Sequence, residues 1–75
     1  MDYKQYIERN PDIMLGKPII KGTRITVELI MRKLAGGYKV IDIVKSYPHL
    51  TEEQILAAFA YAADMIANEE TLEIA

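Results

Sequence analysis

The feature that most constrains the fold is a segment, residues 51–68, that is apolar almost all the way round a helix. Ile55 and Phe59 begin one apolar stripe at helical spacing, and Leu56 and Ala60 begin a second stripe beside it. A helix with so little polar surface is normally buried on more than one side. Alanine also favours helices intrinsically, which is the simpler explanation for its abundance.

The start of this helix is specified by two local motifs. Thr51 and Gln54 have the spacing of a capping box, and Leu50 and Ile55 occupy the two positions of a hydrophobic staple. We therefore expect a helix that begins at Thr51 and runs to about Asn68.

The short chain makes a second copy the expected partner of this helix. A chain of 75 residues buries only about 60% of the surface that its unfolded form exposes, and this one has no cysteine for disulfides or thiolate metal sites. His49 is its one histidine, too few for a zinc site, and we predict no metal or cofactor. We predict a homodimer, whose interface is formed by Leu56, Phe59, Ala60, Ala63 and Ala67.

Two shorter helices are predicted before it. Thr26 is a good N-cap for a helix over residues 26–35, which Gly36-Gly37 ends. Residues 40–47 are ambiguous, because their β-branched side chains favour a strand whereas their apolar spacing favours a helix. We choose the helix, which Pro48 stops.

The N-terminal part is expected to add a small β-hairpin. Residues 2–14 are mixed in character and predict a short helix or strand. Over residues 16–27, two β-branched runs flank Lys21-Gly22, and Gly22 supplies the positive φ of the turn. The predicted fold is mainly α, an N-terminal β-hairpin followed by three helices, with one domain over residues 1–68 and an acidic tail over residues 69–75.

Charge is distributed unevenly along the chain. Residues 1–34 hold seven Lys/Arg and four Asp/Glu, whereas residues 35–75 hold two and seven. We predict a nucleic-acid-binding surface in the first half, where a β-ribbon and the following helix could bring cations to phosphates. Its candidate residues are Lys17, Lys21, Arg24, Arg32 and Lys33. The alternative is a solvated edge that discourages strand-to-strand aggregation.

The last two helices, joined by a short turn, have the order of a helix-turn-helix. A recognition helix presents its first residues to bases, and here these are Glu52, Glu53 and Gln54. Two of them repel phosphate, so we do not expect this helix to read DNA.

Neither catalysis nor membrane insertion is predicted. No acid at a suitable spacing marks His49 as a base, and the threonines and serines are explained by caps and turns. The longest apolar stretch, residues 55–63, is far shorter than the roughly 20 residues of a membrane span. The first four residues do not resemble a secretory leader, and we expect a cytoplasmic protein that is not an enzyme.

Several short motifs occur in the order of a known family. They are Gly16-Lys17-Pro18 followed by Gly22-Thr23-Arg24, a helix that ends in glycine, Tyr47-Pro48-His49-Leu50-Thr51, and Ala58-Phe59-Ala60-Tyr61. With them the chain resembles the family called domain of unknown function 433 over about residues 5–66. His49 departs from the family pattern, in which an acidic residue is frequent at that position.

The resemblance implies a three-helix fold like that of homeodomains or winged helices, commonly dimeric. It also implies an antitoxin of a type II toxin–antitoxin system, which binds a PIN-like ribonuclease toxin and its own operator DNA. The acidic tail could occupy the RNA-binding surface of such a toxin through charge complementarity. The candidate toxin-binding residues are Glu69, Glu70, Leu72, Glu73 and Ile74. A dimeric DNA-binding regulator or adaptor without a toxin is the alternative.

Overall fold

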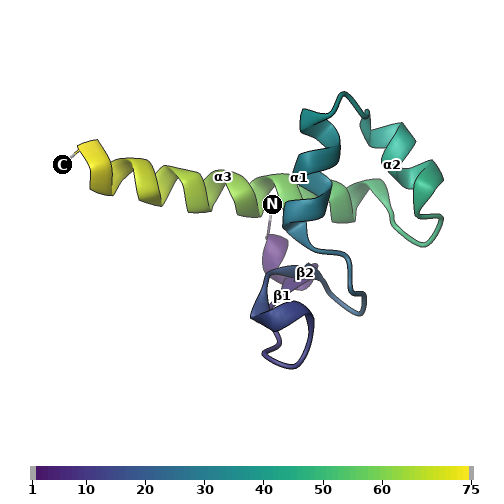
Figure 1. Ribbon diagram of the computed structural model, residues 1–75, viewed down its shortest axis with the longest axis horizontal. Helices are drawn as coiled ribbons and strands as arrows, with labels where there is room; N and C mark the ends of the chain where they lie inside the picture. The colour runs from purple at the N-terminus through teal and green to yellow at the C-terminus, as the bar shows by residue number, and fades with distance from the viewer. Residues whose placement is uncertain (1, 75) are drawn as a thin grey trace.

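The computed structural model describes residues 2–74, and the side chains of residues 2–68. Its elements are, in order, a 3-10 turn Tyr3–Gln5, β1 Ile7–Glu8, a turn Met14–Gly16, β2 Ile19–Ile20, α1 Val27–Ala35, α2 Val40–Ser46 and α3 Glu52–Ile74. α3 runs along the long axis of the molecule, α1 crosses it, and α2 lies beside its N-terminal end (Figure 1). The predicted fold class, mainly helical with β structure before three helices, is confirmed.

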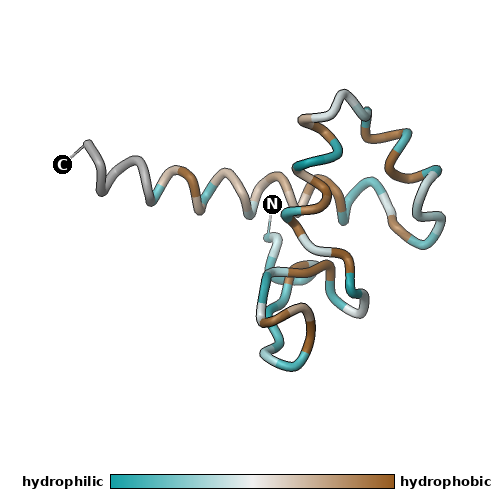
Figure 2. Tube along the Cα trace, viewed as in Figure 1, coloured by the Kyte–Doolittle hydropathy of each residue, from teal (hydrophilic) through white to brown (hydrophobic). Residues whose placement is uncertain are grey.

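The core lies where the other elements meet the N-terminal half of α3. Strongly apolar residues occur in the strand region and in all three helices (Figure 2). The largest fully buried side chains are isoleucines, and every helix and β2 contributes at least one: Ile19, Ile20, Ile30, Ile43 and Ile55. Each element is therefore fixed by packing against the others as well as by its own propensity.

The β structure differs in part from the predicted hairpin over residues 16–27. The turn after β2 is present, with Gly22 at φ +80°. β2, however, forms its two-stranded antiparallel sheet with β1, in which Ile7 pairs with Ile20. On its other edge β2 makes only an isolated bridge, from Ile19 to Thr26. The second arm is short because Thr26 already caps α1, where its side chain accepts a hydrogen bond from the backbone N–H of Leu29 at 3.0 Å.

The two shorter helices agree with the prediction. α1 begins directly after Thr26, and the Gly36 N–H closes its last turn on the carbonyl oxygens of Arg32 and Lys33. The ambiguous segment is helical, and Ile43 is its fully buried residue. The apolar spacing was therefore a better guide than β-branching, because one helical face of this segment packs into the core.

The start of α3 is as predicted and its end is not. Thr51 N–H donates to Gln54 Oε1 at 2.8 Å, and Gln54 N–H donates to Thr51 Oγ1 at 3.2 Å, which completes the capping box. The helix continues to Ile74 instead of ending near Asn68. The sequence after Asn68 contains no Gly or Pro to stop a helix.

Within residues 2–74, no helix combines the length and the apolar character that crossing a membrane requires. Among the described side chains, no three His, Cys, Asp or Glu residues lie together in a group able to hold a metal ion.

Candidate functional site

The predicted nucleic-acid-binding residues are partly brought together, in an open pocket of about 270 Å³ at the start of α1. Lys17 comes from the segment before β2, Arg24 from the turn after β2, and Arg32 from α1. The rest of the lining consists of Met14, Thr26, Glu28 and Leu29. Three cations distant in sequence therefore share one surface, which we call the basic pocket.

Glu28 lies at the centre of this charge cluster. Its Oε1 is 3.0 Å from Lys17 Nζ, and its Oε2 is 3.0 Å from Arg32 Nε. These hydrogen bonds, that from Lys17 first, hold the pKa of Glu28 below its ordinary value. Two of the three cations are thus already paired with one carboxylate, which reduces the positive potential offered to a phosphate.

The other two predicted cations lie elsewhere. Lys21 is exposed in the turn that follows β2 and does not line the basic pocket. Lys33 is half-buried, with Nζ 4.7 Å from the ring centroid of Tyr38 and 5.8 Å from that of Tyr47. An ammonium group over two tyrosine rings stabilises the connection between α1 and α2 through cation–π attraction.

A strained turn that the sequence does not signal borders the basic pocket. Met14, Leu15 and Gly16 have φ values of 49°, 60° and 78°, so two non-glycine residues adopt the left-handed conformation in succession. Such a residue costs on the order of 1–3 kcal/mol and persists only where its surroundings hold it. The side chain of Leu15 is 93% exposed. A Met-Leu dipeptide contains no signal for this geometry, because asparagine, aspartate and glycine are the residues that favour it.

The predicted dimer interface lies on the side of α3 that the core leaves open. Ile55, Ala57 and Ala58 have no exposed surface and form the core side of the helix. At about 3.6 residues per turn, the five predicted interface residues share the opposite side. Of these, Leu56, Ala63 and Ala67 are exposed, and Phe59 and Ala60 are half-buried.

The N-terminal segment contacts α3 at Tyr61, one turn after Ala57 and Ala58 on the core side of the helix. The guanidinium of Arg9 donates to the Tyr61 hydroxyl from Nη2 at 2.6 Å and from Nε at 3.1 Å. The rings of Tyr3 and Tyr61 meet edge to face with centroids 5.5 Å apart. A hydrogen bond to the Asp64 carboxylate raises the pKa of Tyr3. These contacts hold the N-terminal segment against α3. Asp64 is the last residue of α3 that they involve.

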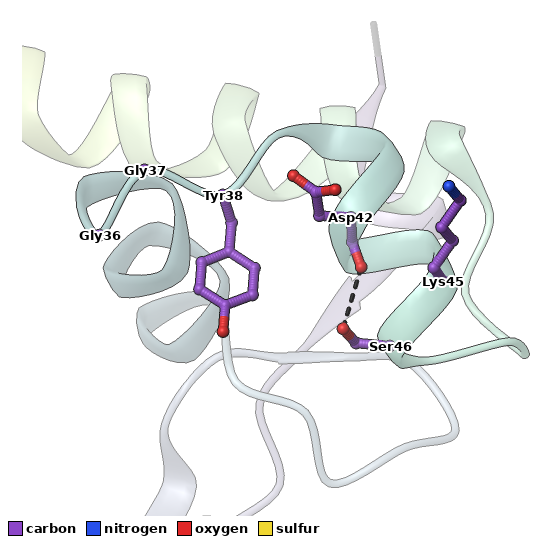
Figure 3. A pocket seen from close by; sticks show the side chains of 6 residues that line it. All are labelled: Gly36, Gly37, Tyr38, Asp42, Lys45 and Ser46. Atoms are coloured by element: carbon purple, nitrogen blue, oxygen red, sulfur yellow. Dashed lines mark hydrogen bonds between the residues drawn. The ribbon is translucent and has the colours of Figure 1, made fainter.

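A larger open pocket, of about 470 Å³, lies between α2 and the turn that follows α1. In Figure 3 the turn Gly36–Tyr38 faces Asp42, Lys45 and Ser46 of α2. The Asp42 carboxylate accepts from the N–H of Lys39 at 2.8 Å, and Ser46 Oγ donates to the Asp42 carbonyl at 2.9 Å. Both polar side chains therefore serve the local structure of α2. His49, in the joint before α3, is exposed.

The side chains of the predicted toxin-binding residues lie outside the described residues. These residues are Glu69, Glu70, Leu72, Glu73 and Ile74. Their backbone continues α3, so the acidic segment is the end of a helix.

Comparison with known proteins places the chain among small domains of the same fold. A crystal structure of a DUF433 member protein from Anabaena variabilis ATCC 29413 aligns with a TM-score of 0.78 and 28% identity, over 96% of this chain and 72% of that one. The uncharacterized protein y4eO of Sinorhizobium fredii (strain NBRC 101917 / NGR234) is 32% identical over 59 residues, which are 79% of this chain. The chain spans only 27% of the length of that relative. The family described as "Protein of unknown function (DUF433)" matches residues 7–62, and the chain belongs to this family.

Proposed function

We propose that the protein is a non-catalytic, antitoxin-like binding module that forms a homodimer through α3 and pairs with a PIN-like ribonuclease toxin. The observation that carries the proposal is the outer side of α3. Leu56 and Ala63, two turns apart on that side, are exposed, although Ile55, Ala57 and Ala58 on the core side of the same helix have no exposed surface. A second copy would bury this apolar side and supply the burial that a chain of this size lacks.

The toxin pairing is argued from charge. Residues 69–74 contain three glutamates together with Leu72 and Ile74, and they follow the end of the core at the far end of α3. A ribonuclease must attract RNA phosphates, so its active surface is expected to be basic. An acidic segment with apolar anchors could compete with RNA for that surface.

The test is inhibition of RNA cleavage by the PIN-like ribonuclease that we propose as the partner. Replacing Glu69, Glu70 and Glu73 with glutamine keeps helix propensity and removes three charges. We expect this variant to lose most of its inhibition, measured as RNA cleavage by the ribonuclease at fixed stoichiometry. Glu52→Gln, together with Glu53→Gln, is the matched control at the other end of α3 and should inhibit like the unmodified chain. Full inhibition by the triple variant would refute the role of the acidic segment.

Binding of operator DNA is a second candidate function. It is favoured by Lys17, Arg24 and Arg32, which line one pocket, and weakened by Glu28 between two of them. The expected signature is an affinity for upstream DNA that falls steeply with salt and drops on Arg24→Ala. An absence of any mobility shift at low salt, with the chain alone and with its toxin complex, would remove this candidate.

A further inference from the structure

The lining of the basic pocket includes apolar side chains, and an exposed leucine follows one of them in the chain. Leu15 is 93% exposed, Met14 42% and Leu29 37%. Met14 and Leu29 also line the pocket that contains the cations. We call the whole set, Met14, Leu15, Lys17, Arg24, Leu29 and Arg32, the Leu15 surface.

The turn that presents Leu15 is held by backbone hydrogen bonds on both sides. Gly16 N–H donates to the Ile13 carbonyl at 3.0 Å, and Lys17 N–H donates to the Met14 carbonyl at 3.1 Å. Upstream, Ile13 N–H donates to the Asn10 carbonyl at 2.9 Å. The exposed leucine is therefore carried on a defined turn, in a backbone conformation that a leucine rarely adopts. Strain of this kind often accompanies binding sites.

The composition of the surface fits an acidic protein segment better than a nucleic acid. Phosphate-binding surfaces are polar and cationic, whereas this one combines its cations with the partly exposed side chains of Met14 and Leu29, and with Leu15 next to Met14 in the chain. A peptide with glutamates and one or two aliphatic side chains would match both parts, with carboxylates near Arg24 and an apolar side chain against Leu15.

We propose that the Leu15 surface docks the acidic C-terminal segment, residues 69–74, of a second copy of the chain. The segment contains Glu69, Glu70 and Glu73 with Leu72 and Ile74 between and after them. The charge imbalance of the chain, basic in its first half and acidic in its second, gives the same complementarity between copies.

Docking within one chain is excluded by the course of α3. The helix is continuous to Ile74 and leads away from the rest of the molecule (Figure 1). From Ala62, the last half-buried residue of α3 among those described, the helix rises about 18 Å to Ile74 at 1.5 Å per residue. Its end therefore points away from the Leu15 surface of its own chain, and it can reach the Leu15 surface of a second copy.

This docking does not depend on the proposed toxin pairing, because both parts belong to this chain. If both occur, a toxin that binds residues 69–74 must displace them from the neighbouring copy. Reciprocal exchange of the segment between two copies would give a closed assembly, whereas one-way docking would give an open one.

The absence of cysteine from the sequence allows a direct test by disulfide trapping between copies. Full-length chains with Leu15→Cys and full-length chains with Ile74→Cys, made distinguishable by mass, are mixed and oxidised mildly. In the control mixture, a Ser46→Cys chain replaces the Ile74→Cys chain. We expect about fivefold more mixed disulfide from the test mixture than from this control. Leu15 and Ser46 are both exposed, so neither substitution disturbs the core.

Charge reversal gives the decisive comparison. Adding Arg24→Glu to the Leu15→Cys chain should return the mixed disulfide to the control level, and adding Glu73→Lys to the Ile74→Cys chain should restore it. Far-ultraviolet circular dichroism of each chain confirms that it is folded. The proposal is overturned if the Leu15→Cys and Ile74→Cys chains form no more mixed disulfide than the Ser46→Cys control. It is also overturned if the Arg24→Glu change leaves that yield unaffected.

Discussion

The first half of α3, residues 52–62, and the start of its second half, residues 63–68, both have apolar residues on the core side of the helix, but their surroundings differ. In the first half Ile55, Ala57 and Ala58 have no exposed surface, because α1, α2 and the N-terminal segment pack around them. In the second half Met65 is 39% exposed and Ile66 53%. Met65 lies seven residues after Ala58 and so on the same side of the helix. The apolar pattern of α3 therefore continues beyond the part of the helix that packs into the core.

This difference shows that an apolar helix face indicates burial, but does not indicate whether the same chain or a partner covers that face. The first half is buried by its own chain. An isolated stretch of helix the length of the second half is marginally stable in water, since helices gain most of their stability from packing. The proposed second copy would pack on the outer side of both halves, at Leu56, Phe59 and Ala60 in the first half and at Ala63 and Ala67 in the second.

The largest effect expected from this comparison is on the core side of α3. Ile55→Ala should lower the free energy of unfolding by about 2–5 kcal/mol, because it leaves a cavity in a fully buried site. Met65→Ala, the matched change beyond the core, should alter it by less than about 0.5 kcal/mol. Urea unfolding followed by circular dichroism measures both. Equal losses for the two variants would mean that the halves do not differ as described.

The next effect tests the outer side of α3. Ala63→Glu places a charge in the middle of the predicted dimer interface and should weaken the dimer about tenfold or more, which is about 1.4 kcal/mol. Sedimentation equilibrium gives the dissociation constant. Ser46→Glu, an exposed change on α2, is the control and should leave it unchanged. A dimer insensitive to Ala63→Glu would have to use another surface.

A smaller effect concerns the contacts that mark the boundary between the halves. Tyr61→Phe removes the hydroxyl that accepts two hydrogen bonds from Arg9, and should cost about 0.5–1.5 kcal/mol. The loss should appear first as faster amide hydrogen exchange in the N-terminal segment. Unchanged exchange over residues 3–9 would show that this contact does not fasten the chain start to α3.

The smallest expected effect is a shift in titration at the same boundary. The hydrogen bond to Asp64 raises the pKa of Tyr3 above its ordinary 10.0. The resulting stability is present below pH 10 and is lost as the pH rises through the higher pKa of the folded state. Asp64→Asn should return the pKa toward 10.0, measured by ultraviolet titration of tyrosinate against Tyr3→Phe. An unchanged titration curve would contradict the Tyr3–Asp64 contact.

Local signals in the sequence were sufficient to place the three helices, although not to predict the end of α3. The Thr51–Gln54 capping box and the Thr26 cap both occur as predicted, because these motifs satisfy backbone groups within a few residues. The helical interpretation of residues 40–47 was also right, since its apolar spacing reports on one packed face.

Features that depend on tertiary context were not predicted. The pairing of β1 with β2 joins residues 7–8 to residues 19–20, and no local pattern specifies that partner. Lys33 was grouped with the other cations, although its helical position directs it to the rings of Tyr38 and Tyr47. The strained turn at Met14 and Leu15 is held by its surroundings and not by its residue types.

The most direct test of the account is the mass of the unmodified chain in solution. Sedimentation equilibrium at micromolar concentration should give twice the 8.5 kDa mass of one chain, with hydrogen exchange in residues 60–68 as slow as in the first half of α3. A folded species with the mass of a single chain, whose residues 60–68 exchange freely, would contradict the claim that a second copy covers the outer side of α3.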